Sequence, residues 1–207
     1  IASTLLGMSV KGFKVNRVLV EEKLKIREEY YLGLTIDRSA KRLVAIASSK
    51  GGIDIEEIAR SHPHLIVKKH IDPLIGFQPF MARQMLKKIG FKGPLLNRMS
   101  QMLYSLYKIA IDYDAELVEI NPLVLTEDGL LIAADARLNI DSDALFRHPE
   151  VRDLKDISQY SKYELEAVES GLSYVELDGD IGIIGNGAGL VMATLDLVKL
   201  YGGNPAN

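Results

Sequence analysis

Cysteine is absent from the 207-residue sequence. Its absence excludes disulfides, thiolate nucleophiles and thiolate metal sites, and it fits a reducing compartment. No apolar run approaches the roughly 20 residues that a transmembrane helix needs, and no signal peptide is visible. Charge of one sign is not in large excess, because the net charge is −3. The sequence therefore carries no electrostatic signature of a protein that binds nucleic acid or anionic membranes.

What remains is the composition of a globular protein. Hydrophobic residues make up 47% of the sequence and charged residues 26%. A chain of this length can bury a sizeable core and form one large domain or somewhat more. The sequence starts at Ile1 rather than at Met, and its last residues, 202–207, close a predicted helix and should lead into another strand. We therefore expect an internal fragment of a longer chain.

Residues 116–138, around which the sequence is organised, have the pattern of a β-hairpin. The two apolar runs are residues 117–126 and 130–134. Between them lies a short loop, 127–129, that ends in glycine. A three-residue loop with Gly129 in the left-handed conformation would pair Thr126 with Leu130.

Four polar side chains gather on one face of this predicted hairpin. In the register set by the loop, Asn121 lies opposite Asp135 and Glu119 lies opposite Arg137, and side chains two residues apart share a face. One interpretation is a site for a hard cation such as Mg²⁺, which takes oxygen ligands from one or two protein side chains. The other is a satisfied polar cluster, with Glu119 paired to Arg137 and Asn121 closing the Asn-Pro turn. The spacing alone leaves both open.

The residues before and after the hairpin predict an α+β layer of strands with helices on one face. Alternating patterns predict strands at residues 16–22, 28–37, 42–48 and 65–71. Apolar residues at helical spacing predict helices at residues 53–60, 77–89 and 94–113. Asp141 and Asp143 follow the hairpin, and we interpret them as helix-capping carboxylates rather than as further cation ligands.

The last part of the sequence predicts a new domain. Residues 149–171 are charged and mostly helical, as in a linker. Short strands at 174–177 and 181–184 precede a glycine-rich bend, 185–189, and a helix at 190–201. Strand, bend and helix together aim backbone N–H groups at an anion. As a dinucleotide fingerprint the bend is weak, because the downstream strand and its acidic residue are missing.

Several stretches in the same order resemble the β subunit of succinyl-CoA synthetase. They are EINPL followed by the hairpin and DARLNIDSDALFRHPE, together with RVLVEE, EYYLGLTIDR, GGIDIEEIA, HPHLIVKKHIDPL and DGDIGIIGNGAGLVMATLDLVKLYGGNPAN. The resemblance implies the second subdomain of an ATP-grasp fold followed by the start of a flavodoxin-like α/β ligase domain. The expected domains are residues 1–160, a partial nucleotide-binding ATP-grasp domain, and residues 172–207, a truncated CoA-ligase domain.

The resemblance also implies a reaction, in which NTP, succinate and CoA give NDP, phosphate and succinyl-CoA. The phosphoryl group would pass to a histidine of an α subunit, then to succinate as succinyl phosphate, which CoA would attack. The implied cofactor is Mg²⁺, the nucleotide is ATP or GTP, and the partner is the α subunit. The compartment would be the cytoplasm, or the mitochondrial matrix in a eukaryote.

Site residues follow from the same resemblance, position by position. Glu119 would lie near the partner's histidine, where it would orient that ring or hold its proton, and Asn186 would contact the carboxylate substrate. Asn121 and Asp135 would hold Mg²⁺. The positions that match nucleotide contacts are Glu21 for the base, Leu24 through its backbone and Glu29 for the ribose hydroxyls. Residue type alone favours a solvated rim for Glu21 and Glu29.

Rival functions keep part of this picture. Malate–CoA ligase and ATP-citrate lyase subunits would share the ATP-grasp fold and would differ in the pocket that binds the carboxylate substrate. A non-catalytic nucleotide-binding subunit would keep the fold, although Glu119, Asn121 and Asp135 together argue against a pure scaffold. A dinucleotide-binding oxidoreductase would rest on residues 185–189 alone.

Overall fold

The computed structural model describes residues 2–10, 13–152, 154 and 160–207. These residues form two compact units. One is Leu19–Asp153, and the other combines Ile1–Val18 with Leu154–Asn207.

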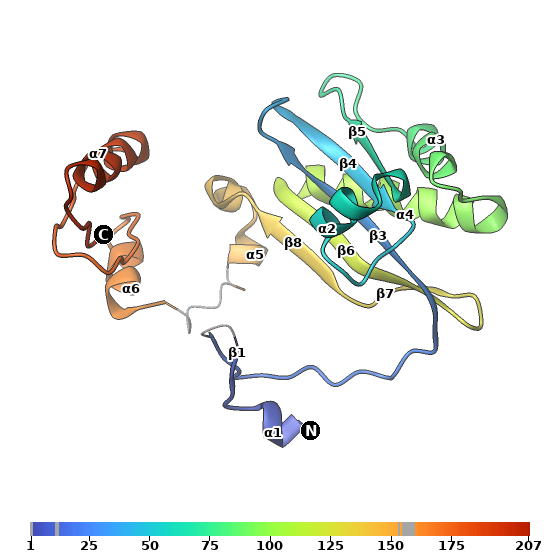
Figure 1. The fold of residues 1–207 in the computed structure, drawn as a ribbon, viewed down its shortest axis with the longest axis horizontal. Helices are drawn as coiled ribbons and strands as arrows, with labels where there is room; N and C mark the ends of the chain where they lie inside the picture. Colours follow the sequence, from blue (N-terminus) through green and yellow to red (C-terminus); the bar gives the residue numbers. More distant parts are fainter. Residues whose placement is uncertain (1, 11–12, 153, 155–159) are drawn as a thin grey trace. The chain divides into compact units, whose positions relative to one another are not determined.

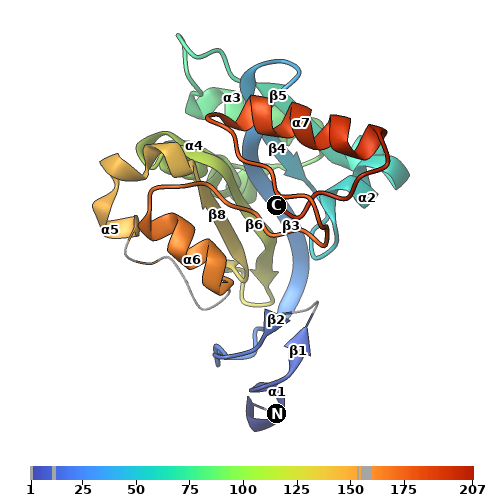
Figure 2. The same cartoon turned by 90° about the vertical axis from the view of Figure 1, so that its left-hand side faces the viewer.

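The larger unit is built on a six-stranded sheet in which every pairing is antiparallel. Its strands are β3 (Ile26–Asp37), β4 (Arg42–Ser48), β5 (Ile66–His70), β6 (Ala115–Thr126), β7 (Leu131–Ala133) and β8 (Ala136–Ile140). The order is β5-β4-β3-β6, and both β7 and β8 pair with β6 (Figures 1 and 2). The long strands β3 and β6 therefore lie side by side at the centre of the sheet.

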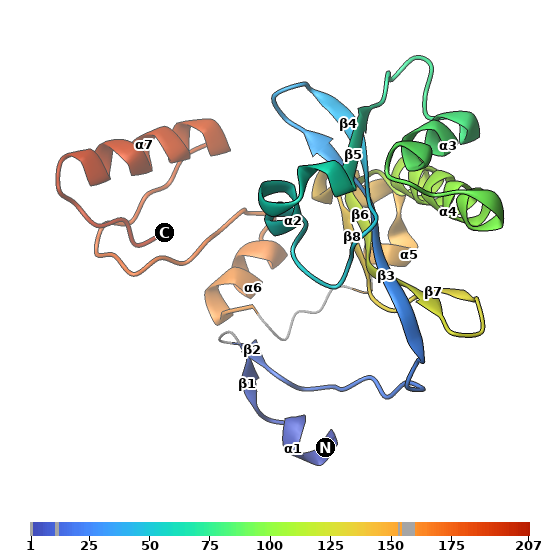
Figure 3. The same ribbon diagram turned by 45° about the vertical axis from the view of Figure 1, so that its right-hand side comes forward.

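Two helices, α3 (Pro79–Lys88) and α4 (Gly93–Asp112), pack on one face of this sheet (Figure 3). Their apolar stripes meet the inward-facing residues of the central strands. The fully buried contacts include Leu32 and Leu34 of β3, Leu123 of β6, and Met99 and Leu103 of α4. Hydrophobic burial on this face is the main stabilising contribution to the unit.

The other face carries a smaller apolar cluster and leaves room for polar side chains. The helix α2 (Ile55–Ser61) lies on this side (Figure 3). Its Ile55 packs against a buried group formed by Tyr31, Val44 and Ile46. Because Val118 and Ile120 belong to the opposite core, Glu119 between them points to the α2 side.

The predicted hairpin register is confirmed. Gly129 adopts a φ of +83°, and the N–H of Thr126 donates to the carbonyl oxygen of Leu130 at 2.9 Å. Glu119 is paired with Arg137 across β6 and β8, and the N–H of Asn121 donates to the carbonyl oxygen of Asp135 at 3.1 Å. The sheet partners predicted at 28–37, 42–48 and 65–71 and the helices at 53–60, 77–89 and 94–113 also form, within a few residues.

The strand predicted at residues 16–22 is wrong. This segment is irregular, and Leu19 and Val20 are 83% and 80% exposed. Both sides of β3 are occupied by β4 and β6, and residues 16–22 pair with none of the described strands.

Short elements complete the larger unit. They are the 3-10 helices η1 (Pro63–Leu65) and η2 (Ser142–Arg147) and the helix α5 (Pro149–Arg152). Asp141 caps η2, since its side chain accepts a hydrogen bond from the N–H of Asp143 at 2.9 Å. The capping role expected for this carboxylate is confirmed.

The smaller unit contains the helix α1 (Ala2–Leu5), the paired strands β1 (Ser9–Val10) and β2 (Phe13–Lys14), and the helices α6 (Lys162–Glu169) and α7 (Ala188–Leu200). The helix predicted at 190–201 is α7, and Gly202 follows it with a φ of +82°. The strands predicted at 174–177 and 181–184 are wrong as regular strands, because these described residues form a single parallel bridge, from Ile181 to Pro205. Part of the helical linker predicted at 149–171 lies outside the described residues.

A parallel bridge joined through a helix is the connection of a βαβ unit. This bridge supports an α/β beginning for the domain expected at 172–207, which stays a prediction. None of the helices in the described ranges is long and apolar enough to cross a membrane.

Candidate functional site

The polar face of the hairpin is covered by the loop 50–53, which connects β4 to α2. Asn121 fastens this loop with both heteroatoms of its side chain. Its Oδ1 accepts a hydrogen bond from the N–H of Gly52 at 2.8 Å, and its Nδ2 donates to the carbonyl oxygen of Ile53 at 3.0 Å. Because the two bonds demand opposite polarity, they fix which end of the amide is which.

A bulge in the sheet aims Asn121 at the loop. The register between β3 and β6 shifts between Tyr30 and Leu32, where the single residue Tyr31 faces both Asn121 and Pro122. A bulge of this kind turns a side chain away from the regular ladder and is common beside functional sites. Asn121 is half-buried in this position.

Glu29 lies on the same face and reaches the same loop. A Cβ atom added to Gly52 would lie 2.6 Å from Oε2 of Glu29, so this carboxylate sits directly against the loop backbone. Gly52 also has a φ of +74°, a conformation that other residues rarely adopt. The predicted ribose-binding residue and the predicted metal ligand Asn121 therefore meet at one glycine.

Glu119 occupies the next position along this face. One of its carboxylate oxygens, Oε2, accepts a hydrogen bond of 2.9 Å from the hydroxyl of Tyr31. The alternative, an ion pair between Glu119 and Arg137, does not form. Nε of Arg137 donates instead to Oδ1 of Asn139 at 3.3 Å. Burial and the neighbouring Glu119 carboxylate raise the pKa of Tyr31, so its hydroxyl remains a donor.

Asp135 lies exposed between β7 and β8, opposite Asn121. Glu119, Asn121 and Asp135 thus bring two carboxylates and one amide to the same stretch of the hairpin. These are hard oxygen donors, the ligands that Mg²⁺ takes from proteins. The described residues include no cluster of three His, Asp or Glu side chains able to hold a metal ion by themselves. A cation here would need further oxygen ligands, such as phosphate or water.

The remaining predicted residues are Glu21, Leu24 and Asn186. Glu21 is exposed and Leu24 half-buried in the irregular segment that precedes β3. The neighbouring Lys25 carbonyl accepts the N–H of Glu127, which ties this segment to the hairpin loop. Asn186 belongs to the smaller unit, where it is exposed in the bend before α7. Glu21 and Leu24 thus precede the strand that carries Glu29.

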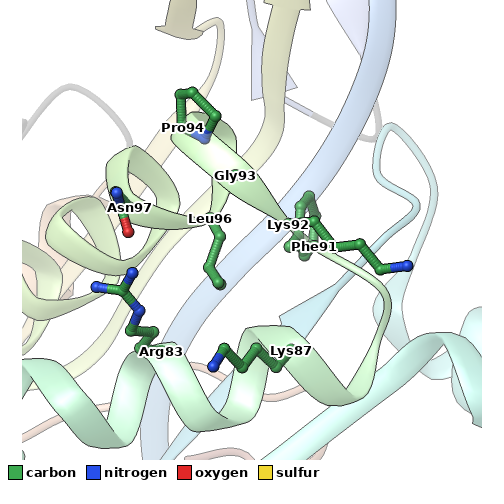
Figure 4. Close-up of a pocket in the computed structure, with 8 residues that line it drawn as sticks. All are labelled: Arg83, Lys87, Phe91, Lys92, Gly93, Pro94, Leu96 and Asn97. Atoms are coloured by element: carbon green, nitrogen blue, oxygen red, sulfur yellow. The ribbon is translucent and has the colours of Figure 1, made fainter.

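A hollow of about 650 Å³ lies on the opposite side of the sheet, between α3 and α4 (Figure 4). Arg83, Lys87 and Lys92 line it, with Leu96 contributing apolar surface. Since α3 and α4 cover the face away from Glu119, this basic groove is not part of the hairpin site.

Sequence reasoning missed two members of the site, Tyr31 and the loop 50–53. Tyr31 alternates with apolar residues and has the pattern of an ordinary core position. The available signal was glycine. Gly33 lies two residues after Tyr31 on the same strand face, and the pair Gly51-Gly52 follows shortly after a buried strand.

Comparison with known proteins defines the class first. Residues 1–125 match the ATP-grasp domain family, so the chain belongs to that family. Within it, the relatives are β subunits of succinate–CoA ligase. The chain is 52% identical over 206 residues to the GDP-forming subunit beta of Thermus thermophilus, and 48% and 47% identical to the ADP-forming subunits beta of Natronomonas pharaonis and Bacteroides thetaiotaomicron.

Each of these alignments covers 100% of this chain and 54% or 55% of the relative, so the chain spans about half the length of the curated relatives it matches. A solved structure of ATP citrate lyase from Methanothrix soehngenii matches with a TM-score of 0.71 at 17% identity, over 99% of this chain and 51% of that one. At that identity the likeness shows the fold alone. The family resemblance and the ATP-grasp fold expected from the sequence are both confirmed.

Proposed function

We propose that this chain is the nucleotide- and metal-holding part of a succinate–CoA ligase β subunit. The whole protein would convert NTP, succinate and CoA to NDP, phosphate and succinyl-CoA with an α subunit as partner, in the cytoplasm or the mitochondrial matrix. One observation carries the proposal: Glu29 and Asn121 meet at Gly52, with Glu119 on the same face and Asp135 opposite Asn121 in the hairpin. The relatives of this chain bear that name.

Asn121 and Asp135 are the residues that would hold Mg²⁺. Their oxygens fit this cation, and Oδ1 of Asn121 keeps a second lone pair beside the bond from Gly52. When bound, Mg²⁺ would neutralise charge on the nucleotide phosphates during phosphoryl transfer. The loop 50–53 contributes by holding the amide of Asn121 in one orientation.

Glu119 would act on the histidine of the α subunit. A carboxylate beside an imidazole ring fixes the orientation of the ring, because it accepts a hydrogen bond from the ring nitrogen that does not react. The Tyr31 bond occupies Oε2 of Glu119, which leaves Oε1 for this partner. Glu119 is half-buried at the surface of the sheet, so a loop of another subunit could reach it.

The nucleotide would lie along the start of β3. Glu29 would accept hydrogen bonds from the ribose hydroxyls, Glu21 would accept one from the base, and Leu24 would offer its backbone. Asn186 of the smaller unit would bind the succinate carboxylate through its amide. Whether the acid is succinate, malate or citrate would depend on that second site.

Labelling of the α subunit tests this proposal. The full-length chain is coexpressed with its α partner and incubated with γ-labelled ATP or GTP and Mg²⁺, and acid-labile phosphohistidine on α is followed for wild type and D135N. The proposal expects labelled α with wild type, loss of most label with D135N, and discharge of the label by succinate with CoA in preference to malate or citrate. An α subunit that neither nucleotide labels would refute it.

A further inference from the structure

Tyr31 makes a contact that an ordinary core tyrosine has no need of. Its side chain is buried, with 2% exposed, yet its hydroxyl reaches across to the neighbouring strand and donates to Oε2 of Glu119 at 2.9 Å. The two residues are 88 positions apart in the chain. A buried tyrosine hydroxyl normally finds one partner, and this one has taken a residue of the candidate site.

Gly33 creates the path for that contact. A Cβ atom at this position would lie 2.5 Å from the Tyr31 hydroxyl and 2.9 Å from the ring carbon that bears it. Gly33 is also the residue directly opposite Glu119 in the ladder between β3 and β6. The tyrosine ring therefore lies over a glycine, along the strand, and ends beside the carboxylate on the next strand.

The surroundings of Tyr31 also hold its side chain, and thereby its bond to Glu119, in one geometry. The Tyr31 ring packs with Val44, Ile46 and Ile55, so it cannot turn to follow Glu119. Burial also keeps the phenol protonated, which makes it a constant donor. A glutamate at a strand surface would otherwise sample several side-chain rotamers, and the bond selects those in which Oε2 faces the sheet.

We infer that Tyr31 is a positioning residue, which holds the Glu119 carboxylate so that its second oxygen is aimed at the histidine of the partner subunit. This inference rests on the proposed function. It predicts that the Tyr31 hydroxyl affects the rate of phosphoryl transfer and leaves nucleotide binding unchanged. Preorganisation of a reacting group by a packed neighbour typically affects rate by about 10- to 100-fold.

Tyr30 is a matched control for Tyr31. It is the adjacent residue, it is also 2% exposed, and its hydroxyl also donates to a glutamate, Glu28, at 2.7 Å. It belongs to the core on the other face of the sheet, against Phe91. Removing either hydroxyl deletes the same atoms at the same depth, and only one of the two variants touches the candidate site.

The test uses the full-length protein with its α partner. Phosphorylation of α is followed by rapid quench for wild type, Y31F and Y30F, with melting temperatures and nucleotide affinities measured alongside. We expect Y31F to slow phosphorylation about 10-fold or more while its nucleotide Kd stays within twofold, and Y30F to match wild type. Equal rates in Y31F and Y30F, or a loss in Y31F that a lowered melting temperature accounts for, would overturn the inference.

Two further variants separate positioning from structure. In an E119Q background, Y31F should not slow the phosphorylation of α any further, because the two residues act as one unit. A double-mutant cycle measures this. G33A should reproduce the Y31F defect, since the new methyl group displaces the hydroxyl without removing it. Additive losses in the cycle would contradict the inference. Failure of wild type itself to label α would instead refute the proposed function.

Discussion

The backbone N–H of Gly52 donates a 2.8 Å hydrogen bond to the side chain of Asn121, 69 residues further along the chain. Together with the bond from Asn121 to Ile53, it ties the connection between β4 and α2 onto the central hairpin. The amide is thereby oriented before any ligand arrives. Residues that orient a metal ligand contribute to metal affinity nearly as much as the ligand itself does.

Removing the amide should release the loop. In N121A the N–H of Gly52 and the carbonyl of Ile53 lose their partner, at a cost of about 1 kcal/mol, or roughly fivefold faster opening. Hydrogen exchange of a peptide covering residues 49–58 should accelerate accordingly, while a peptide covering α3 on the opposite face should not change. Unaltered exchange over 49–58 would mean that the bonds do not hold the loop.

A side chain at position 52 should disturb Glu29. G52A introduces a methyl group at a φ of +74° and 2.6 Å from Oε2 of Glu29. Gly90 is the control, because its φ of +95° imposes similar strain and nothing lies within 4 Å of its added Cβ. Both variants should lose about 1–2 kcal/mol of unfolding free energy. Only G52A should weaken nucleotide binding, by roughly tenfold in titration calorimetry. Equal nucleotide affinities in G52A and G90A would separate Glu29 from the nucleotide site.

Stability at high pH should depend on the two buried tyrosines. Burial and a neighbouring glutamate raise the pKa of both Tyr30 and Tyr31 above the ordinary value of 10.0. Their stabilising contribution is therefore complete below pH 10 and falls as the pH rises above it, because the unfolded chain then ionises while the folded one does not. Above pH 10, each group should steepen the loss by up to about 1.4 kcal/mol per pH unit.

Urea unfolding of the full-length protein between pH 8 and 11 measures this slope. Y31F and Y30F should each lose stability less steeply than wild type by that amount. Variants whose slopes equal that of wild type would show that the phenols ionise as freely in the folded protein as in the unfolded chain.

The features that sequence predicts here are local ones. The loop 127–129 sets the hairpin register by itself, so the pairing of Glu119 with Arg137 follows from the sequence alone. The amphipathic period of residues 94–113 likewise specifies α4, since it depends only on neighbours one turn away. The helical cap at Asp141 belongs to the same class.

The features that escape the sequence depend on distant partners. The alternation of apolar and polar residues at 16–22 and 174–177 suggests strands, but these described residues pair with no neighbouring strand. The bond from Tyr31 to Glu119 spans 88 residues, and the one local signal, Gly33, does not indicate which residue the tyrosine reaches. The roles of Glu21, Leu24, Glu29, Glu119, Asn121, Asp135 and Asn186 stay predictions.

Metal–nucleotide binding at the hairpin tests the account most directly. Mn²⁺ replaces Mg²⁺, and electron paramagnetic resonance measures how much Mn–ADP or Mn–GDP the full-length protein binds. Asp143 supplies the control, because it is an exposed carboxylate a few residues beyond the hairpin. Wild type and D143N should bind the metal–nucleotide equally, and D135N should bind it at least about 10-fold more weakly. Equal binding by all three proteins would contradict the assignment of this face as the metal–nucleotide site.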